Sequence, residues 1–129
     1  HVVLEPINTR DVPGYFVDRY DVARSVIDDC ASRVGLQFDV YHAACMGLDP
    51  LSELTANLPL VRHVQFADAP GRHEPGTGCI DFEPLWTLLD NAGYTGFVSA
   101  EYRPSGDTQS SLGWLEAWCA GLVNPRDSG

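Results

Sequence analysis

Four oxygen-bearing side chains stand near the ends of four short apolar runs in the sequence. They are Glu5, Asp39, Gln65 and Glu101. Each of them alone could be an ordinary hydrogen-bonded polar group. Three carboxylates gathered in a partly buried site, however, repel one another unless protons or a cation compensate their charge. The pattern therefore favours a divalent metal, and these hard oxygen donors suit Mg²⁺ or Mn²⁺ better than zinc.

The elements that must position these residues are four strands, predicted at 2–5, 36–41, 61–67 and 97–102. Side chains alternate between the two faces of a strand, so residues two apart share a face. One face of each predicted strand is apolar, and the other face carries one of the four oxygen-bearing residues near its end. We expect helices to cover the apolar face.

Segments with helical spacing separate the predicted strands. Predicted helices run from an Asp18 cap to near Gly35, from Asp49-Pro50 to Leu58, from an Asp81 cap to Gly93, and over about 110–122. Trp86, Trp114 and Trp118 are expected to pack rather than to stack on a ligand. The alternation of strands and helices predicts an α/β fold with parallel strands joined by right-handed crossovers.

The separation of the outer strands adds a constraint on the architecture. Strands lie ~4.8 Å apart, so the first and fourth strands of a flat sheet would be ~14 Å apart, too far for Glu5 and Glu101 to share one ion. A closed barrel supplies the missing curvature, but a complete (β/α)₈ barrel needs roughly 250 residues. The 129 residues therefore predict a (β/α)₄ half-barrel over 1–123, a disordered tail at 124–129, and further sequence upstream of His1.

Composition excludes several activities. The chain contains no lysine, which removes Schiff-base chemistry and a P-loop lysine, and its net charge of −10 argues against nucleic-acid binding. We find neither an apolar run long enough for a membrane span nor a signal peptide, and the four cysteines form no C-x-x-C motif. These observations favour a cytoplasmic protein that acts on a small molecule.

Four stretches resemble the hydroxypyruvate isomerase family, within the xylose-isomerase-like TIM-barrel superfamily. They are LEPINTRDVPGYF at 4–16, QFDVYH at 37–42, HVQFADAPGRHEPGTG at 63–78 and SAEYRPSGDTQSSLGWL at 99–115. The resemblance extends over 2–118 and implies strands five to eight of a TIM barrel, its carboxyl-terminal half. It also implies that Glu5, Asp39, Gln65 and Glu101 hold the divalent ion.

The activity that the resemblance implies is the interconversion of hydroxypyruvate and tartronate semialdehyde through an enediolate. Glu5 and Glu101 would then be the proton donor and acceptor, and the residues matching His42 and Arg72 resemble substrate contacts. The carboxylate of such a substrate needs a cationic partner. Arg72 and His73, in a glycine-rich loop, are the predicted partners, with Arg10 and Arg103 as further candidates.

Three alternatives stay open. Ketose 3-epimerases of the same superfamily resemble the chain but carry histidine where this sequence has Gln65. Abasic-site cleavage is a further activity of the superfamily, and the acidic charge argues against it. Finally, the chain could be a truncated half-barrel without activity of its own, whose open strand edges would favour pairing with a missing amino-terminal half or self-association.

Overall fold

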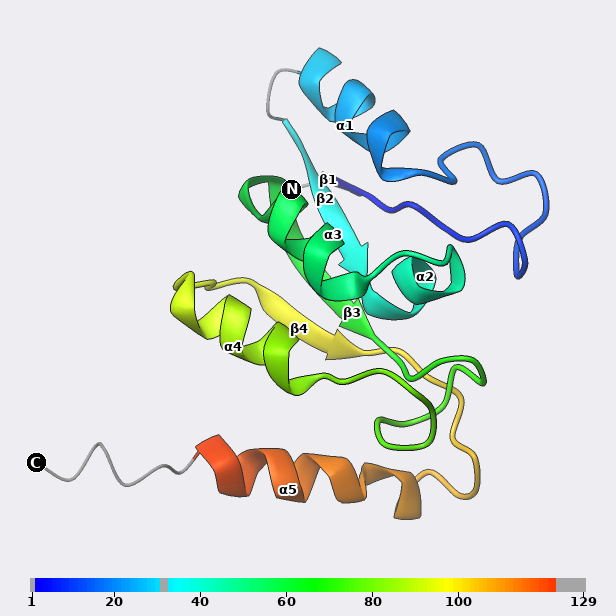
Figure 1. The fold of residues 1–129 in the computed structure, drawn as a ribbon, viewed down its shortest axis with the longest axis vertical. Coiled ribbons are helices and arrows are strands. Elements are labelled where there is room, and N and C mark those ends of the chain that lie inside the picture. Colours follow the sequence, from blue (N-terminus) through cyan, green and yellow to red (C-terminus); the bar gives the residue numbers. More distant parts are fainter. Residues whose placement is uncertain (1, 31–32, 123–129) are drawn as a thin grey trace, which may run out of the picture.

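A parallel four-stranded sheet forms the centre of the computed structural model, which describes residues 2–30 and 33–122 (Figure 1). Its strands stand side by side in chain order and are β1 (Val2–Leu4), β2 (Val34–Asp39), β3 (Val61–Phe66) and β4 (Phe97–Ala100). All three neighbouring pairs are parallel. The predicted α/β class with four strand–helix units is confirmed, whereas the predicted tail at 124–129 lies outside the described residues.

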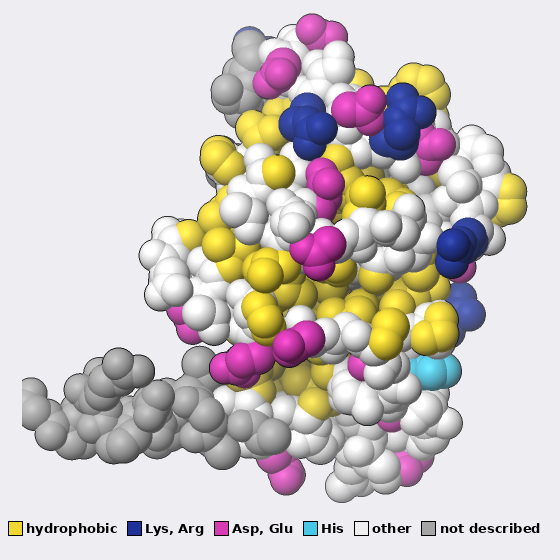
Figure 2. Space-filling model, in the orientation of Figure 1, with side chains coloured by type: hydrophobic (Ala, Val, Ile, Leu, Met, Phe, Trp, Pro, Cys, Tyr) yellow, Lys and Arg dark blue, Asp and Glu magenta, His cyan; other side chains and the backbone are white. Residues whose placement is uncertain are grey.

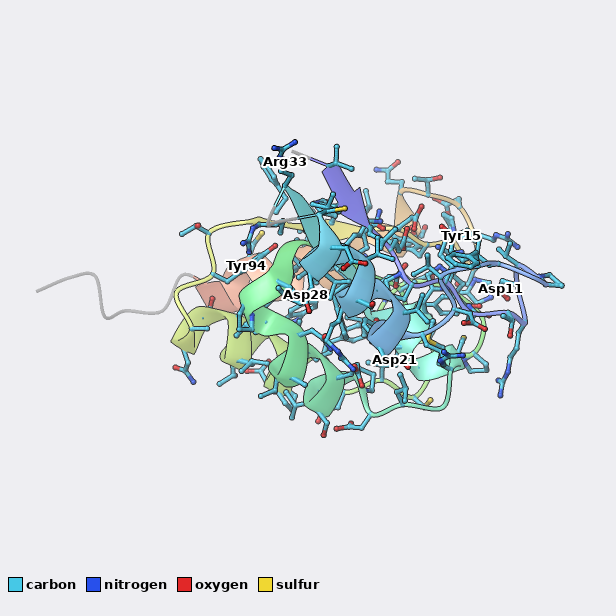
Figure 3. The ribbon with its side chains drawn as sticks, turned by 90° about the horizontal axis from the view of Figure 1, so that it is seen from above. Asp11, Tyr15, Asp21, Asp28, Arg33 and Tyr94 are labelled. Atoms are coloured by element: carbon cyan, nitrogen blue, oxygen red, sulfur yellow. The ribbon has the colours of Figure 1, made fainter. Side chains whose placement is uncertain are left out.

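Helices follow each strand. They are α1 (Tyr20–Asp29), α2 (Val40–Cys45), α3 (Pro50–Asn57), α4 (Glu83–Asn91) and α5 (Gly113–Leu122), with 3₁₀ turns at Leu58–Leu60 and Ser110–Leu112. In Figure 1, α1, α3 and α4 lie in front of the sheet, and the view in Figure 3 places them on one side of it. None of the helices within the described residues is long and apolar enough to cross a membrane.

The helix ends follow the predicted signals in part. Asp49 caps α3, because its carboxylate accepts a hydrogen bond of 3.0 Å from the backbone N–H of Ser52. Gly93, with a φ of +63°, ends α4 as predicted. The prediction for α1 was wrong at both ends: Arg19 precedes the helix without a side-chain cap, and Gly35 lies inside β2.

The end of the second strand also differs from the prediction. Val40 and Tyr41 were expected to extend β2, but they begin the short helix α2. The reason is the side chain of Asp39, whose Oδ1 accepts a hydrogen bond of 2.8 Å from the backbone N–H of Tyr41. This N-cap satisfies a free donor of the first helical turn and turns the chain away from the sheet.

The helix-facing side of the sheet forms the core. Leu36, Phe38, Val64 and Phe66 are each at most 1% exposed, in agreement with the predicted apolar face. The ring of Phe66 is in contact with four aromatic rings, at centroid distances between 5.1 and 5.9 Å: Phe82, Trp86, Trp114 and Trp118. The predicted packing role of the tryptophans is confirmed. Figure 2 shows apolar side chains between the helices of this face, with acidic side chains scattered among them.

The opposite side of the sheet is open. Phe97 on β4, which alternates with the core-packed Val98, is 79% exposed. Over the described ranges, β1 and β4 each pair with a neighbouring strand on one side only. In a complete barrel this face would be the packed interior and both edges would be paired. The chain therefore has the open face and open edges of half a barrel.

A buried aspartate organises the loop between β3 and α4. Asp68 is 1% exposed, and its carboxylate accepts four backbone hydrogen bonds of 2.8–3.1 Å. The donors are the N–H groups of Ala69, Gly76, Gly78 and Ile80. A side chain at Gly78 would collide with the Ala69 carbonyl, so glycine is needed there. The loop that carries Arg72 is thereby fixed to the end of β3.

Asp68→Asn is expected to lower the free energy of unfolding by roughly 1–3 kcal/mol, because the amide NH₂ would face two buried N–H donors. Urea denaturation of the chain measures this change. Asp81→Asn is the matched control, since the exposed Asp81 accepts a single backbone hydrogen bond, from Glu83 at 3.3 Å. Equal losses in the two variants would contradict the role given to Asp68.

Candidate functional site

The carboxyl ends of the strands bring the four predicted oxygen donors to one edge of the sheet. Glu5 directly follows β1, Asp39 ends β2, Gln65 is the last residue but one of β3, and Glu101 directly follows β4. Asp39 and Gln65 are paired in register on neighbouring strands. These four side chains thus stand where parallel-sheet folds place their ligand sites.

Further contacts confirm that this edge is continuous. The backbone N–H of Glu101 donates to the carbonyl of Phe66 at 2.9 Å, which extends the β3–β4 ladder to the predicted site residue. The loop after β1 lies at the same end: Figure 3 shows Asp11 and Tyr15 there, and Arg33 and Tyr94 toward the opposite end of the strands.

Glu5 and Asp39 form the buried centre of the site. The Asp39 side chain is 0% exposed, and the Glu5 side chain is 20% exposed. Glu5 Oε1 and Asp39 Oδ2 are buried and have no hydrogen-bond partner. Burial raises the pKa of Glu5 to about 7, and the nearby Asp39 charge adds to this rise. Burial likewise raises the pKa of Asp39 to about 6, although hydrogen bonding by the Tyr41 N–H and the charge of Arg72 oppose the rise.

His42 is the third group in this centre. Its Nε2 lies 3.8 Å from Asp39 Oδ2 and 4.0 Å from Glu5 Oε1. One ligand atom from each of the three residues lies within 4.8 Å of the other two, so they form a possible metal site. Burial, followed by the charge of Arg72, lowers the pKa of His42 to about 4. The imidazole is therefore neutral at pH 7.

Gln65 stands beside this centre and is oriented by a residue that the sequence analysis missed. Its Oε1 accepts a hydrogen bond from the side-chain amide of Gln37. An amide oxygen has two lone pairs, so this bond leaves one for a metal ion. Gln37 lies two residues before Asp39 on the same strand, and the face alternation of the strand could have identified it.

Arg72 joins the two sides of the site. Its Nη2 lies 2.8 Å from Glu101 Oε2 and 3.6 Å from Asp39 Oδ2, and its guanidinium group lies 4.9 Å from the centre of the Tyr41 ring. Arg72 has a φ of +57°, which is uncommon for a residue with a side chain. The Asp68-anchored loop holds it in that conformation, so that the arginine partly compensates the acidic cluster.

His73, predicted beside Arg72, makes a different contact. Its Nδ1 lies 2.6 Å from the backbone oxygen of Arg103, while the Arg103 N–H donates to the Arg72 carbonyl at 2.8 Å. Arg72 and Arg103 line a cavity of about 360 Å³ together with Asp11, Tyr41, Pro70 and Gly71. This cavity therefore adjoins the acidic cluster through Arg72, and two arginines line it.

The donor chemistry fits a divalent cation. Two buried carboxylate oxygens without hydrogen-bond partners face the same space, and an amide oxygen and a third carboxylate stand at the adjacent strand ends. Carboxylates left in this state cost free energy unless a proton or a cation neutralises them. Hard oxygen donors of this kind favour Mg²⁺ or Mn²⁺.

Comparisons with known proteins agree with this geometry. The chain is 38% identical over 118 residues to the 2-oxo-tetronate isomerase of Cupriavidus necator, covering 91% of this chain and 45% of the relative. It is 34% identical over 118 residues to the hydroxypyruvate isomerase of Escherichia coli, covering 91% of this chain and 46% of the relative. The chain thus spans about half the length of the curated relatives it matches.

A solved structure shows the same half-length match. The crystal structure of an AP endonuclease, family 2, from Brucella melitensis superposes with a TM-score of 0.85 at 36% identity, covering 91% of this chain and 46% of that one. The four strand–helix units therefore align with about half of a TIM barrel. Residues 1–118 match the family described as xylose isomerase-like TIM barrel. The chain belongs to the xylose isomerase-like TIM barrel family.

Proposed function

We propose that this chain carries the metal site and the proton-transfer groups of an isomerase acting on a small hydroxy-oxo acid, with hydroxypyruvate and tartronate semialdehyde as the interconverted pair. The observation that carries this proposal is the pair of buried, unpartnered oxygens, Glu5 Oε1 and Asp39 Oδ2, at the carboxyl ends of parallel strands. The names of the similar isomerases supply the substrate class.

Glu5, Asp39, Gln65 and Glu101 are the proposed metal ligands, and Mg²⁺ or Mn²⁺ the proposed ion. When bound, such an ion withdraws electron density from the substrate's carbonyl and hydroxyl oxygens, which acidifies the neighbouring C–H bond. Glu101 would have to share or release its contact with Arg72 to serve as a ligand. Arg72 would then be freed to meet an anionic group.

Proton transfer is assigned to the two glutamates. Glu5 follows the first strand and Glu101 the last strand, so the two carboxylates approach the space between them from different sides. In the proposed reaction one carboxylate removes the proton from the hydroxymethyl carbon, giving an enediolate, and the other delivers a proton to the adjacent carbon, while the hydroxyl proton passes from the first oxygen to the second. The overall change moves hydrogen within one molecule and needs no oxidant.

The substrate contacts are proposed to be His42, Arg72 and the loop around His73. Arg72 lines the cavity beside the acidic cluster, where a guanidinium group can bind the substrate carboxylate. His73 contacts the backbone oxygen of Arg103, so its proposed contribution is to hold Arg103 next to Arg72. An uncharged ketose offers these two arginines no anionic partner, which favours the isomerase over the epimerase alternative.

Removal of the metal or of Glu101 is expected to abolish turnover. Hydroxypyruvate isomerisation should be measured with the chain alone and with the chain joined to the amino-terminal half of the E. coli relative, which supplies the remaining strands. EDTA should stop the reaction and Mn²⁺ restore it, and Glu101→Gln should lower kcat by about 10²–10⁴-fold, as expected for a lost general acid or base.

The matched control for this experiment is Glu83→Gln, an exposed acid on α4 that should leave turnover unchanged. Full activity of Glu101→Gln would disprove the role of Glu101. Turnover of D-fructose in place of hydroxypyruvate would instead identify a ketose epimerase.

The affinity for Mn²⁺ should rise with pH up to about 7 and level off above it. A cation displaces the protons of Glu5 and Asp39, whose pKa values of about 7 and about 6 mean that both are protonated at lower pH. Calorimetric titration between pH 5.5 and 8, in two buffers of different ionisation enthalpy, measures the affinity and the protons released. A constant affinity over this range would contradict a site built on these two carboxylates.

We also propose that the open half of the barrel has a partner, either an amino-terminal half-barrel or a second copy of this chain. The exposed Phe97 and the open edges of β1 and β4 support this proposal. Sedimentation analysis of the chain alone should show association, and Phe97→Ser should weaken it. A well-behaved monomer across the micromolar range would argue against obligate pairing.

A further inference from the structure

Asn8 is a buried residue in the loop after β1 that makes several hydrogen bonds. It is 1% exposed, and its side-chain oxygen accepts hydrogen bonds from the backbone N–H groups of Arg10 at 3.1 Å and Asp11 at 2.9 Å. An NH₂ group cannot accept such bonds, so these two donors fix which end of the amide is oxygen. The NH₂ end then faces Asp11 Oδ2 at 3.2 Å and His42 Nδ1 at 2.6 Å.

This orientation determines where the imidazole proton of His42 resides. The Asn8 NH₂ group can only donate, so His42 Nδ1 must accept, and the Asn8 backbone N–H approaches the same nitrogen at 3.4 Å. A neutral imidazole carries one proton, which therefore lies on Nε2. Nε2 is the nitrogen that faces Glu5 and Asp39.

We propose that Asn8 is a positioning residue that holds His42 in the Nε2–H tautomer, so that His42 faces the acidic cluster as a hydrogen-bond donor and not as a metal ligand. By distance alone, His42 could bind a metal ion together with Glu5 and Asp39. A protonated nitrogen has no lone pair to give to a metal, however, and a proton on Nδ1 would meet the N–H groups of Asn8. The ion is then held by oxygen atoms only.

The tautomer also indicates which group the free N–H of His42 can donate to. Its distances of 3.8 and 4.0 Å to the two carboxylates are longer than a hydrogen bond, so the Nε2–H can point to an oxygen of a molecule bound between them. This second part rests on the proposed function, with a substrate hydroxyl or carbonyl oxygen as the acceptor. The tautomer itself follows from the contacts of Asn8.

The test is the ¹⁵N NMR spectrum of the imidazole nitrogens of the chain at pH 7, with the His42 signals assigned by their loss in His42→Gln. We expect a pyridine-like shift for Nδ1 and a pyrrole-like shift for Nε2, both retained when Mg²⁺ is added. Asn8→Asp keeps the size of the side chain but presents an acceptor to Nδ1, so the two shifts should exchange. A pyrrole-like Nδ1 in the unaltered chain would overturn the proposal.

Two further variants distinguish a change of tautomer from a folding defect. Asp11→Asn alone leaves the Asn8 donor in place and should keep the original spectrum. The double variant Asn8→Asp with Asp11→Asn restores a donor–acceptor pair between positions 8 and 11 and should show the exchanged spectrum. An unchanged His42 tautomer in a folded double variant would overturn the proposal. Failure of the proposed function would appear instead as missing turnover in the unaltered protein, whatever the His42 spectrum shows.

Discussion

The crowding of carboxylates at one edge of the sheet is the constraint on which the rest of this structure depends. Parallel strands bring their carboxyl ends to one edge, so Glu5 and Asp39 come together as a direct result of the topology, and Arg72 links Glu101 to them. Like charges in a partly buried space are stable only when something neutralises them. Arg72 does so on one side, and burial, which raises the pKa values of Glu5 and Asp39, adds to the cost of leaving these two carboxylates charged without a partner.

Several local features position the groups around these carboxylates, each through hydrogen bonds. Asp39 uses one oxygen to begin α2 and leaves the other for the site. The Asp68 carboxylate fixes the loop that brings Arg72 to the cluster in a left-handed conformation. Asn8 ties the loop after β1 to His42. The site is thus assembled from strand ends and from the first residues beyond them, while the helices supply the core behind it.

The sequence was sufficient to predict the strands, their parallel order and the placement of the four oxygen-bearing side chains near the strand ends, because these depend on face alternation and on residue type. It did not predict α2, since the capping bond from Asp39 to Tyr41 competes with an apolar pattern that equally suits a strand. Nor did it indicate Gln37 or Asn8 as site residues. Gln37 shares a strand face with Asp39, but its contact with Gln65, 28 residues away, is visible only once the chain is folded. The importance of Asn8 comes from its contact with His42, 34 residues away, which no strand pattern indicates.

The loop held by Asp68 has a consequence for how this site can change during evolution. All four N–H groups that bind the Asp68 carboxylate belong to residues 69–80, so the shape of the loop is encoded within a single short segment. Positions 72–75 lie between those anchor points. Substitutions there can alter the group offered to a ligand while the four bonds to Asp68 stay in place, so the side chains of this segment can vary while the loop keeps its frame.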